Sequence, residues 1–226
     1  MPVRPYRVEE FQAVLDSNAF AGGDKERNRL IFALQATMGP RIHEALALKC
    51  GDIWDSQYKL KKRIWFKKTK NGSPRAIEIP AELNPFFYAW QKILIEWGLF
   101  LSDVPLFCRQ NGKAVSRYHV YRLYQKAHRE LNLSELGTHS ARKTWATNTH
   151  AFWTEQMRRG MNIDPLAMTA KLGGWKDINS CSRYIGLDLY NMNLSQNFVS
   201  KKLLGQKSAQ NLHFQQFNAE IISCEQ

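Results

Sequence analysis

Two short arginine motifs contain the residue types that can grip an oxyanion. The first is Arg41-x-x-Glu44, which follows Gly39-Pro40, and the second is His139-x-x-Arg142. Two guanidiniums can pair their donors with two oxygens of one anion and neutralise charge that develops there. Residues three apart lie on one face of a helix, so each motif would present both of its polar groups together.

A tyrosine that could act as a nucleophile lies further along the chain. Tyr184 follows Trp175 by nine residues, and Trp175 ends the segment Leu172-Gly173-Gly174-Trp175. A tyrosine hydroxyl has a pKa of about 10, so it needs nearby cations and a base before it can attack. Taken singly, each of these residues has a simpler interpretation as a packed aromatic, an ion-pair partner or a capping histidine.

The most basic part of the chain reads as a β-hairpin. Eight Lys and Arg residues and no acidic residue lie between Lys59 and Arg75, interleaved with apolar and aromatic residues. Asn71-Gly72 between β-prone stretches predicts a turn, with strands near 60–68 and 75–79. Such a block of like charge favours a polyanionic partner. A lysine-rich edge strand that resists aggregation is an equally good interpretation of this segment alone.

The order of these motifs resembles the catalytic domain of the tyrosine recombinases, the phage-integrase family. That family has an Arg in a G-x-R-x-x-E box, a Lys on a β-hairpin, an H-x-x-R box, a His or Trp, and then a nucleophilic Tyr. The resemblance extends over roughly residues 5–190. The Gly-Gly-Trp form is similar to that of Cre recombinase, whereas Leu-Gly-His is the more usual form.

The resemblance implies a site, a chemistry and a DNA surface. Its catalytic residues are Arg41, Lys70, His139, Arg142, Trp175 and Tyr184, with Glu44 in support, and its DNA-binding residues are Lys61, Lys62, Arg63, Lys67, Lys68 and Arg75. Tyr184 would form a 3′-phosphotyrosyl link to DNA, and Lys70 would protonate the 5′-oxygen that leaves. Lys68 is the alternative general acid. The resemblance implies neither a metal nor a cofactor.

The elements that must position these residues are mostly helical. Apolar spacing, caps and Gly-Pro breaks predict helices over 8–20, 24–38, 40–48, 81–97, 116–131, 139–151, 165–172, 177–185 and 195–204. Asp24, Ser116, Thr138 and Asp164 are the expected capping residues. We therefore expect an α+β fold, mainly α-helical, with one small antiparallel hairpin.

Composition excludes several other classes of protein. The 226 residues have a net charge of +12, 44% hydrophobic and 12% aromatic residues, which excludes a disordered chain. No apolar run is long enough for a membrane span, and the N-terminus lacks the apolar region of a secretory signal. The four cysteines are far apart in sequence, so we expect small buried residues and a cytoplasmic, DNA-associated protein.

The resemblance also sets expectations for domains and partners. Residues 1–190 would form the catalytic domain, and 191–226 a C-terminal helix and polar tail that docks on a neighbouring subunit. No N-terminal core-binding domain is expected, as in solitary catalytic domains of this family. The expected partners are double-stranded DNA, three further copies in a homo-tetramer, and an accessory or core-binding protein. Two alternatives stay open, which are a catalytically silent DNA-binding regulator and a type IB topoisomerase-like strand relaxase.

Overall fold

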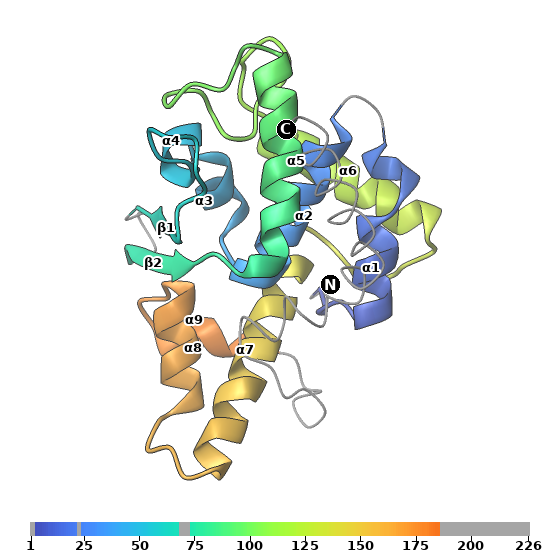
Figure 1. The fold of residues 1–226 in the computed structure, drawn as a ribbon. Helices are drawn as coiled ribbons and strands as arrows, with labels where there is room; N and C mark the ends of the chain where they lie inside the picture. The colour runs from blue at the N-terminus through green and yellow to red at the C-terminus, as the bar shows by residue number, and fades with distance from the viewer. Residues whose placement is uncertain (1–2, 22–23, 68–72, 186–226) are drawn as a thin grey trace, which may run out of the picture.

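The chain folds into a helical body with a small hairpin on one side (Figure 1). The computed structural model describes residues 3–21, 24–67 and 73–185. In chain order the elements are α1 (Val8–Leu15), η1 (Asn18–Phe20), α2 (Lys25–Met38), α3 (Ile42–Leu46), α4 (Cys50–Ile53), β1 (Arg63–Phe66), β2 (Arg75–Glu78), η2 (Ala81–Leu83), α5 (Asn84–Glu96), α6 (Arg117–Glu130), α7 (Ser140–Arg158), α8 (Pro165–Gly173) and α9 (Ile178–Ser182). The fold is mainly α-helical, with an antiparallel two-stranded sheet among the described residues, as the sequence predicts.

Helix α2 forms the centre of the main core. It packs against α5 and α7, and 11 of its 14 residues are buried. Phe32 stacks on Phe11 with ring centroids 5.0 Å apart and meets Tyr124 edge to face at 5.3 Å. Gly39 ends α2 with φ +67°, a left-handed conformation that favours glycine. The chain thereby turns sharply, and Arg41 starts the next helix beside the end of α2.

The hairpin places one face inward and one outward. The register pairs Arg63 with Glu78, Ile64 with Ile77, Trp65 with Ala76 and Phe66 with Arg75. Ile64, Phe66 and Ile77 are buried in the main core, whereas Trp65 is 58% exposed. Because side chains alternate along a strand, burial of the apolar face fixes this register.

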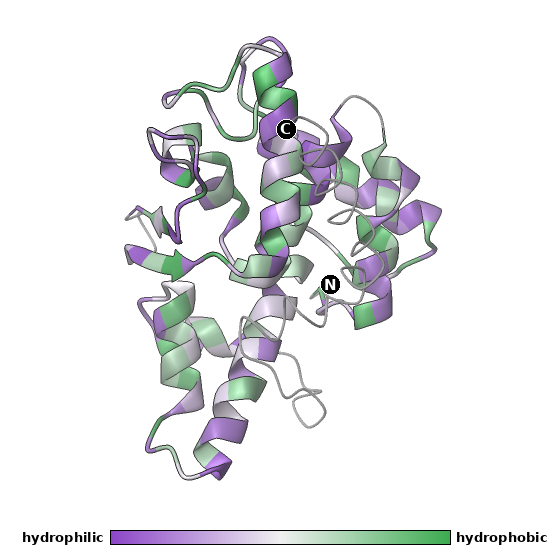
Figure 2. Cartoon of the chain, in the orientation of Figure 1, coloured by the Kyte–Doolittle hydropathy of each residue, from purple (hydrophilic) through white to green (hydrophobic). Residues whose placement is uncertain are grey.

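Helices α7, α8 and α9 pack together and form a second, smaller core. Helix α7 runs from α2 away from the body, with α8 and α9 beside it (Figure 1). Figure 2 shows apolar residues along much of α8 and hydrophilic residues at the far end of α7. Trp145, Trp175 and Cys181 are buried there, with Tyr184 packed against them. Two of the predicted site residues therefore belong to this core.

Two of the four predicted capping residues, Asp164 and Ser116, cap their helices in the structure. The side chain of Asp164 accepts hydrogen bonds from the backbone N–H groups of Leu166 and Ala167 at 2.8 and 3.0 Å. Ser116 likewise accepts from the N–H of His119 at 3.1 Å. Both are the capping contacts that the sequence predicts.

Several predicted boundaries are wrong. The expected helix over 8–20 ends at Leu15, because Ser17 accepts from the N–H of Ala19 and starts a separate turn. Thr138 is not the cap of α7, since Ser140 closes that turn by accepting from the N–H of Gly137 at 3.0 Å.

Other elements differ in length from the prediction. Helix α7 continues to Arg158 instead of ending near Ala151, and the strands are shorter than 60–68 and 75–79. Asp24 precedes α2, but its carboxylate pairs with Arg27 at 2.8 Å instead of capping the helix. Helix α4 was not predicted, and the expected helix over 195–204 lies outside the described residues.

The described cysteines are buried, as the sequence predicts. Cys50, Cys108 and Cys181 are buried free thiols, whereas Cys224 lies outside the described residues. Burial raises the pKa of Cys50 to about 12, so this thiol stays protonated and packs as a small apolar group. Within the described ranges, no helix has the length and apolar character needed to cross a membrane.

Candidate active site

Arg142 lies at the centre of the predicted residues and is held by two helix ends. Its guanidinium donates to the carbonyl of Gly39, at the end of α2, and to the carbonyl of Gly173, at the end of α8, the latter at 2.7 Å. Helix C-termini carry partial negative charge, so both ends favour a cation. Burial, with Arg41 and Arg75 nearby, lowers the pKa of Arg142, but a guanidinium remains charged near neutrality.

Glu44 joins three arginines in one ion-pair network. Its carboxylate accepts from the backbone N–H of Arg41 at 2.7 Å and from the Arg41 side chain at 3.1 Å. It accepts two further bonds from Arg75, at 3.1 and 2.9 Å, and lies 4.0 Å from Arg142. Burial alone would raise the pKa of Glu44, but the hydrogen bonds from Arg75 and from the Arg41 backbone, with the charges of Arg75 and Arg142, outweigh it and lower the pKa to about 2.

Arg75 occupies a different place from the one that the sequence predicts. We expected it on the DNA-binding surface with the other basic residues of the hairpin. Its side chain is 6% exposed, forms a fork on Glu44, and lies over the ring of Phe66 at 4.9 Å. The side chain points to the buried face of β2 because residue 75 shares that face with Ile77.

The aromatic residues of the site surround Arg142. The ring of Trp175 lies 4.0 Å from the Arg142 guanidinium carbon, and the ring of Tyr184 lies 5.6 Å from it. Trp175 stacks on Trp145 with centroids 6.1 Å apart and planes 24° apart. Guanidiniums are attracted to aromatic faces, so this stack helps hold the charge in place.

Tyr184 and His139 face each other across the site. The Tyr184 hydroxyl lies 3.4 Å from Nδ1 of His139, and the two rings meet edge to face. Partial burial, with the positive charges of Arg142, Arg117 and Lys143, lowers the pKa of His139. The imidazole is therefore neutral near pH 7, and with its proton on Nε2 it can accept the tyrosine proton at Nδ1.

A polar pocket opens beside this pair. It has a volume of about 430 Å³, and its lining residues are Arg41, Trp175, Lys176, Asp177, Ser180, Arg183 and Tyr184. The Arg41 side chain is 15% exposed, whereas that of Arg142 is 1% exposed. An anion that enters the pocket therefore meets Arg41 and Tyr184 first, and Arg142 acts from behind Trp175 through its field.

The hairpin is attached to the same site. The N–H of Ser73 donates to the carbonyl of Gly174 at 3.2 Å, next to Trp175. Gly174 has φ +66°, and a Cβ there would lie 2.7 Å from Nη1 of Arg75. Lys70 and Lys68, the two candidates for the general acid, lie outside the described residues.

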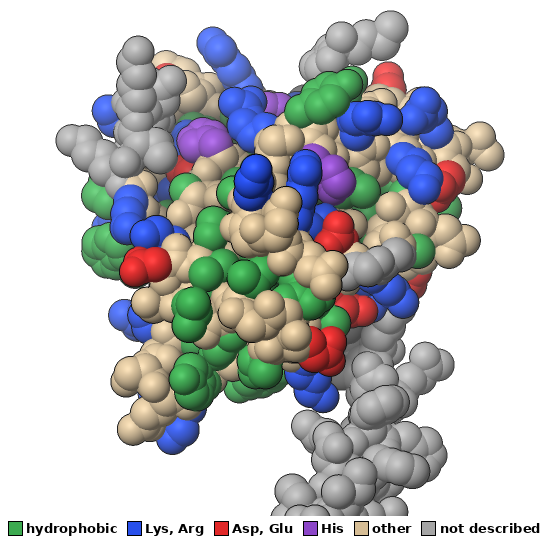
Figure 3. All heavy atoms as spheres, turned by 90° about the horizontal axis from the view of Figure 1, so that it is seen from above, with side chains coloured by type: hydrophobic (Ala, Val, Ile, Leu, Met, Phe, Trp, Pro, Cys, Tyr) green, Lys and Arg blue, Asp and Glu red, His purple; other side chains and the backbone are tan. Residues whose placement is uncertain are grey.

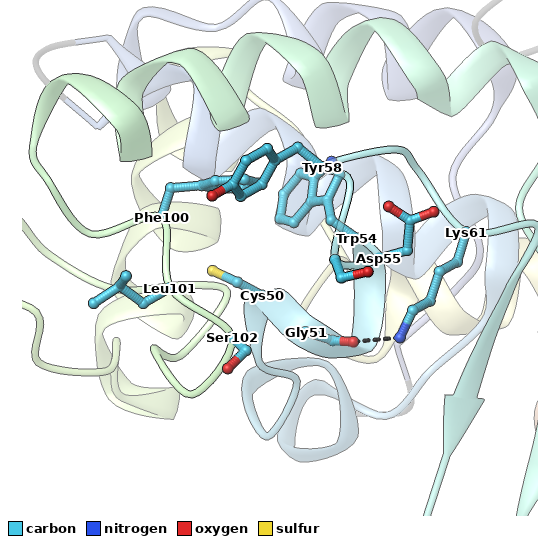
Figure 4. Close-up of a pocket in the computed structure, with 10 residues that line it drawn as sticks. Cys50, Gly51, Trp54, Asp55, Tyr58, Lys61, Phe100, Leu101 and Ser102 are labelled. Carbon is cyan, nitrogen blue, oxygen red and sulfur yellow. Dashed lines mark hydrogen bonds between the residues drawn. The ribbon is translucent and has the colours of Figure 1, made fainter.

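The other basic residues of the hairpin are exposed, namely Lys61, Lys62, Arg63 and Lys67. Lys61 is partly engaged, because its ammonium donates to the carbonyl of Gly51 at the edge of a second pocket (Figure 4). That pocket, about 520 Å³, is lined by the aromatic rings of Trp54, Tyr58 and Phe100 and by none of the predicted catalytic residues. Its apolar lining is unlike the arginine-rich site.

Sequence reasoning missed several cations near the site, namely Arg117 and the pocket-lining residues Lys176 and Arg183. Arg117 begins α6, and its charge contributes to lowering the pKa of both His139 and His43. Its signal in the sequence was the basic and aromatic start of the helix that Ser116 caps.

Figure 3 shows Lys and Arg side chains spread around a central apolar area on one face of the molecule, with fewer acidic ones.

Comparison with known proteins identifies the family. The sequence matches the phage integrase family over residues 6–189. It is 24% identical over 189 residues to a probable integrase/recombinase, YoeC of Bacillus subtilis (strain 168), covering 82% of this chain and 91% of that protein.

Solved structures show the same fold. The XerH site-specific recombinase bound to a palindromic difH substrate, a post-cleavage complex, matches with a TM-score of 0.64 and 22% identity, over 83% of this chain and 49% of that one. A lambda integrase tetramer bound to a Holliday junction matches with a TM-score of 0.59 and 16% identity, over 84% and 50%. The chain thus spans about half the length of those two proteins. Because the family match extends over most of its length, this chain belongs to the phage integrase family.

Proposed function

We propose that this chain is a site-specific recombinase that cuts and rejoins DNA with Tyr184 as its nucleophile. The observation that carries the proposal is the 3.4 Å approach of the Tyr184 hydroxyl to His139, at a pocket whose wall includes Arg41. A tyrosine, a neutral base and fixed guanidiniums are what attack on a phosphodiester requires. A protein that only binds DNA needs no such arrangement.

The proposed reaction has two steps, cleavage of a DNA strand and its rejoining. His139 accepts the proton of Tyr184 while the phenolic oxygen attacks phosphorus, and the bond to the 5′-oxygen breaks as that oxygen takes a proton from Lys70. The products are a 3′-phosphotyrosyl link and a free 5′-hydroxyl. Attack of a 5′-hydroxyl on the same phosphorus reverses the step and reseals a strand. Arg41 and Arg142 offset the charge that develops on the phosphate oxygens.

The exposed part of the hairpin supports DNA binding as the first stage. Lys62, Arg63 and Lys67 are exposed on it, and phosphate contacts from such residues give strong salt dependence. Lys67→Gln should reduce the slope of log affinity against log salt by about 0.9. Lys92→Gln, an exposed lysine on α5, is the matched control. Equal salt-dependence slopes for the two variants would exclude Lys67 from the DNA-binding surface.

We also propose assembly on DNA as a homo-tetramer, with residues 191–226 docking on a neighbouring copy. The support is fold similarity to a lambda integrase whose tetramer holds a Holliday junction. Crosslinking on a synthetic four-way junction, followed by mass measurement, tests the stoichiometry. A chain truncated after residue 190 should then bind as a lower oligomer, and tetramer formation by that truncated chain would contradict the docking.

A nicked suicide substrate tests the reaction itself. Purified protein is mixed with candidate sites from DNA that flanks the gene, and a denaturing gel shows protein joined to a DNA 3′ end. We expect an adduct that Tyr184→Phe abolishes while DNA binding persists. A gel shift without an adduct would favour a silent regulator. Relaxation of plasmids that carry a single site would favour a topoisomerase-like relaxase.

A further inference from the structure

Trp65 is an exposed aromatic residue of the hairpin that the chemistry above does not use. It is 58% exposed on β1, whereas its neighbours Ile64 and Phe66 are buried. Arg63 and Lys67, two residues before it and two after it, are exposed as well. Because alternate residues of a strand point to one face, the indole lies between two cations on the outward face.

The neighbouring strand leaves this ring uncovered. In the register of the hairpin Trp65 pairs with Ala76, whose side chain is a single methyl group. A larger residue at that position would pack on the indole, as directly opposed side chains in a sheet do. The indole therefore keeps more than half of its surface open to a partner.

A small cavity beside Trp65 lies next to the candidate active site. It has a volume of about 100 Å³, and its lining residues include Trp65, Lys67 and Glu44. The Glu44 carboxylate also accepts hydrogen bonds from the backbone and side chain of Arg41, which lines the pocket of Tyr184. One carboxylate thus lies between the cavity of the exposed ring and the arginine that would grip the phosphate.

The proposed reaction generates a ligand that fits this surface. After cleavage, the strand with the free 5′-hydroxyl must separate from its complement before it can attack a phosphorus on another duplex, so its terminal bases become unpaired. Proteins bind single-stranded DNA with aromatic rings that stack on bases and cations that follow the backbone. Trp65 between Arg63 and Lys67 has this composition. An apolar protein surface would instead have to bury both cations, which is costly.

We propose that Trp65 is a stacking platform for an unpaired base of the released DNA strand. This inference rests on the proposed function, because strand exchange is what exposes the base. The indole holds the base by its face, and Arg63 and Lys67 hold phosphates on either side. Duplex DNA does not make this contact, since each of its bases is already stacked between neighbours. Trp65 takes no part in bond breaking.

Binding of short DNA tests the platform without a known target site, because stacking on aromatic rings is sequence-tolerant. The probes are a fluorescent single strand of about 12 nucleotides, within the usual range of single-strand sites, and the same strand paired with its complement. Fluorescence anisotropy gives the affinity for each. The variants are Trp65→Ala and Trp65→Phe, the second of which keeps an aromatic face. Tyr88→Ala, which removes a 45% exposed ring from α5, is the matched control.

We expect Trp65→Ala to weaken single-strand binding about 5- to 150-fold, the range that loss of stacking on one base produces. Its duplex binding and the salt dependence on both probes should match those of the unchanged chain, because no charge is removed. Trp65→Phe should keep most of the single-strand affinity, and Tyr88→Ala should keep all of it. Full single-strand affinity in Trp65→Ala, or an equal loss on both probes, would overturn the inference.

A fluorescent base analogue shows whether the contact is stacking. In a forked duplex, 2-aminopurine is placed in the unpaired 5′ arm, where stacking on an indole quenches its fluorescence. The unchanged chain should quench it and Trp65→Ala should not, and quenching that persists in Trp65→Ala would overturn the inference.

The adduct assay separates this inference from the proposed reaction. Absence of an adduct from the unchanged chain would overturn the reaction, and the two DNA probes would still decide on the platform. An adduct together with full single-strand affinity in Trp65→Ala would overturn the platform alone.

Discussion

Replacing Gly39 with alanine tests whether the end of α2 holds the site together. Gly39 has φ +67°, and its carbonyl accepts from Arg142. A Cβ there would lie 2.2 Å from Cδ2 and 2.3 Å from Cε3 of Trp145. Trp145 is fully buried and stacks on Trp175, so it has little freedom to retreat.

The expected loss of stability has two parts. A left-handed backbone costs about 1–2 kcal/mol for a residue with a Cβ. Overpacking a rigid core adds about 1–3 kcal/mol, so Gly39→Ala should lose about 2–5 kcal/mol in total. Gly98 provides the matched control, because its φ is +68° and a Cβ would meet nothing within 4 Å. Gly98→Ala should therefore lose only the first part, about 1–2 kcal/mol.

Urea unfolding of the two variants measures the difference directly. Circular dichroism at 222 nm follows the helices, and the midpoints convert to free energies of unfolding. In thermal scans, each kcal/mol should lower the Tm by about 2–4 °C for a chain of this size. Equal losses for Gly39→Ala and Gly98→Ala would refute the reasoning, because they would show that Trp145 does not press on Gly39.

Three further predictions follow from the charges and rings of the site. The lowered pKa of His139 keeps its ring neutral near pH 7, so the cleavage rate should fall only as the pH drops below the ordinary histidine value of 6.5. Arg117→Gln removes a facing cation and should move that limb of the pH–rate profile to higher pH, and an unmoved limb would contradict it. For Glu44, folding lowers the carboxyl pKa from 4.5 to about 2. The charged form thus stabilises the fold by about 3 kcal/mol above pH 4.5, and this stability is lost as the pH falls toward 2. The free energy of unfolding of Glu44→Gln, measured by urea unfolding at several pH values, should lack this loss at acid pH. An unchanged pH dependence would argue against the ion-pair network of Glu44 and its arginines. Trp175→Phe removes an N–H donor and should lower adduct formation about 10- to 100-fold, whereas Trp175→His should retain more activity. Equal rates for the two Trp175 variants would show that the donor is not used.

Residue type and spacing were enough to predict much of the fold and the grouping of the site. Arg41, His139, Arg142, Trp175 and Tyr184 were chosen from motifs, and the structure brings them together around one pocket and its buried wall. Helix periodicity likewise predicted α2, and the caps Ser116 and Asp164 predicted α6 and α8, because those signals are local. Their roles in chemistry stay predictions that the cleavage assay addresses.

What the sequence could not predict depends on tertiary contacts. Arg75 looked like one more surface cation, because nothing local shows that its strand turns that side chain toward Glu44. Gly39 looked like an ordinary helix breaker, although its carbonyl also receives Arg142. Thr138 is a residue type that caps helices, but in the structure the hydroxyl of Ser140 accepts the hydrogen bond from Gly137 at this turn. In each case the contact was decided by a residue that is distant in sequence or that competes for the same position. A local sequence pattern does not contain that information.

The stacked pair of Trp145 and Trp175 gives the site an optical signature. Their rings are 6.1 Å apart and only 24° from parallel, so their electronic transitions interact with each other. The contribution of this pair to circular dichroism is the part of the spectrum that Trp175→Phe removes, because Trp90 and Trp97, 5.4 Å apart, form a second pair outside the site. The guanidinium of Arg142 lies 4.0 Å from the Trp175 ring. An anion that interacts with this charge would therefore shift that part of the spectrum. Arrival of a phosphate could therefore be followed spectroscopically in the unlabelled protein.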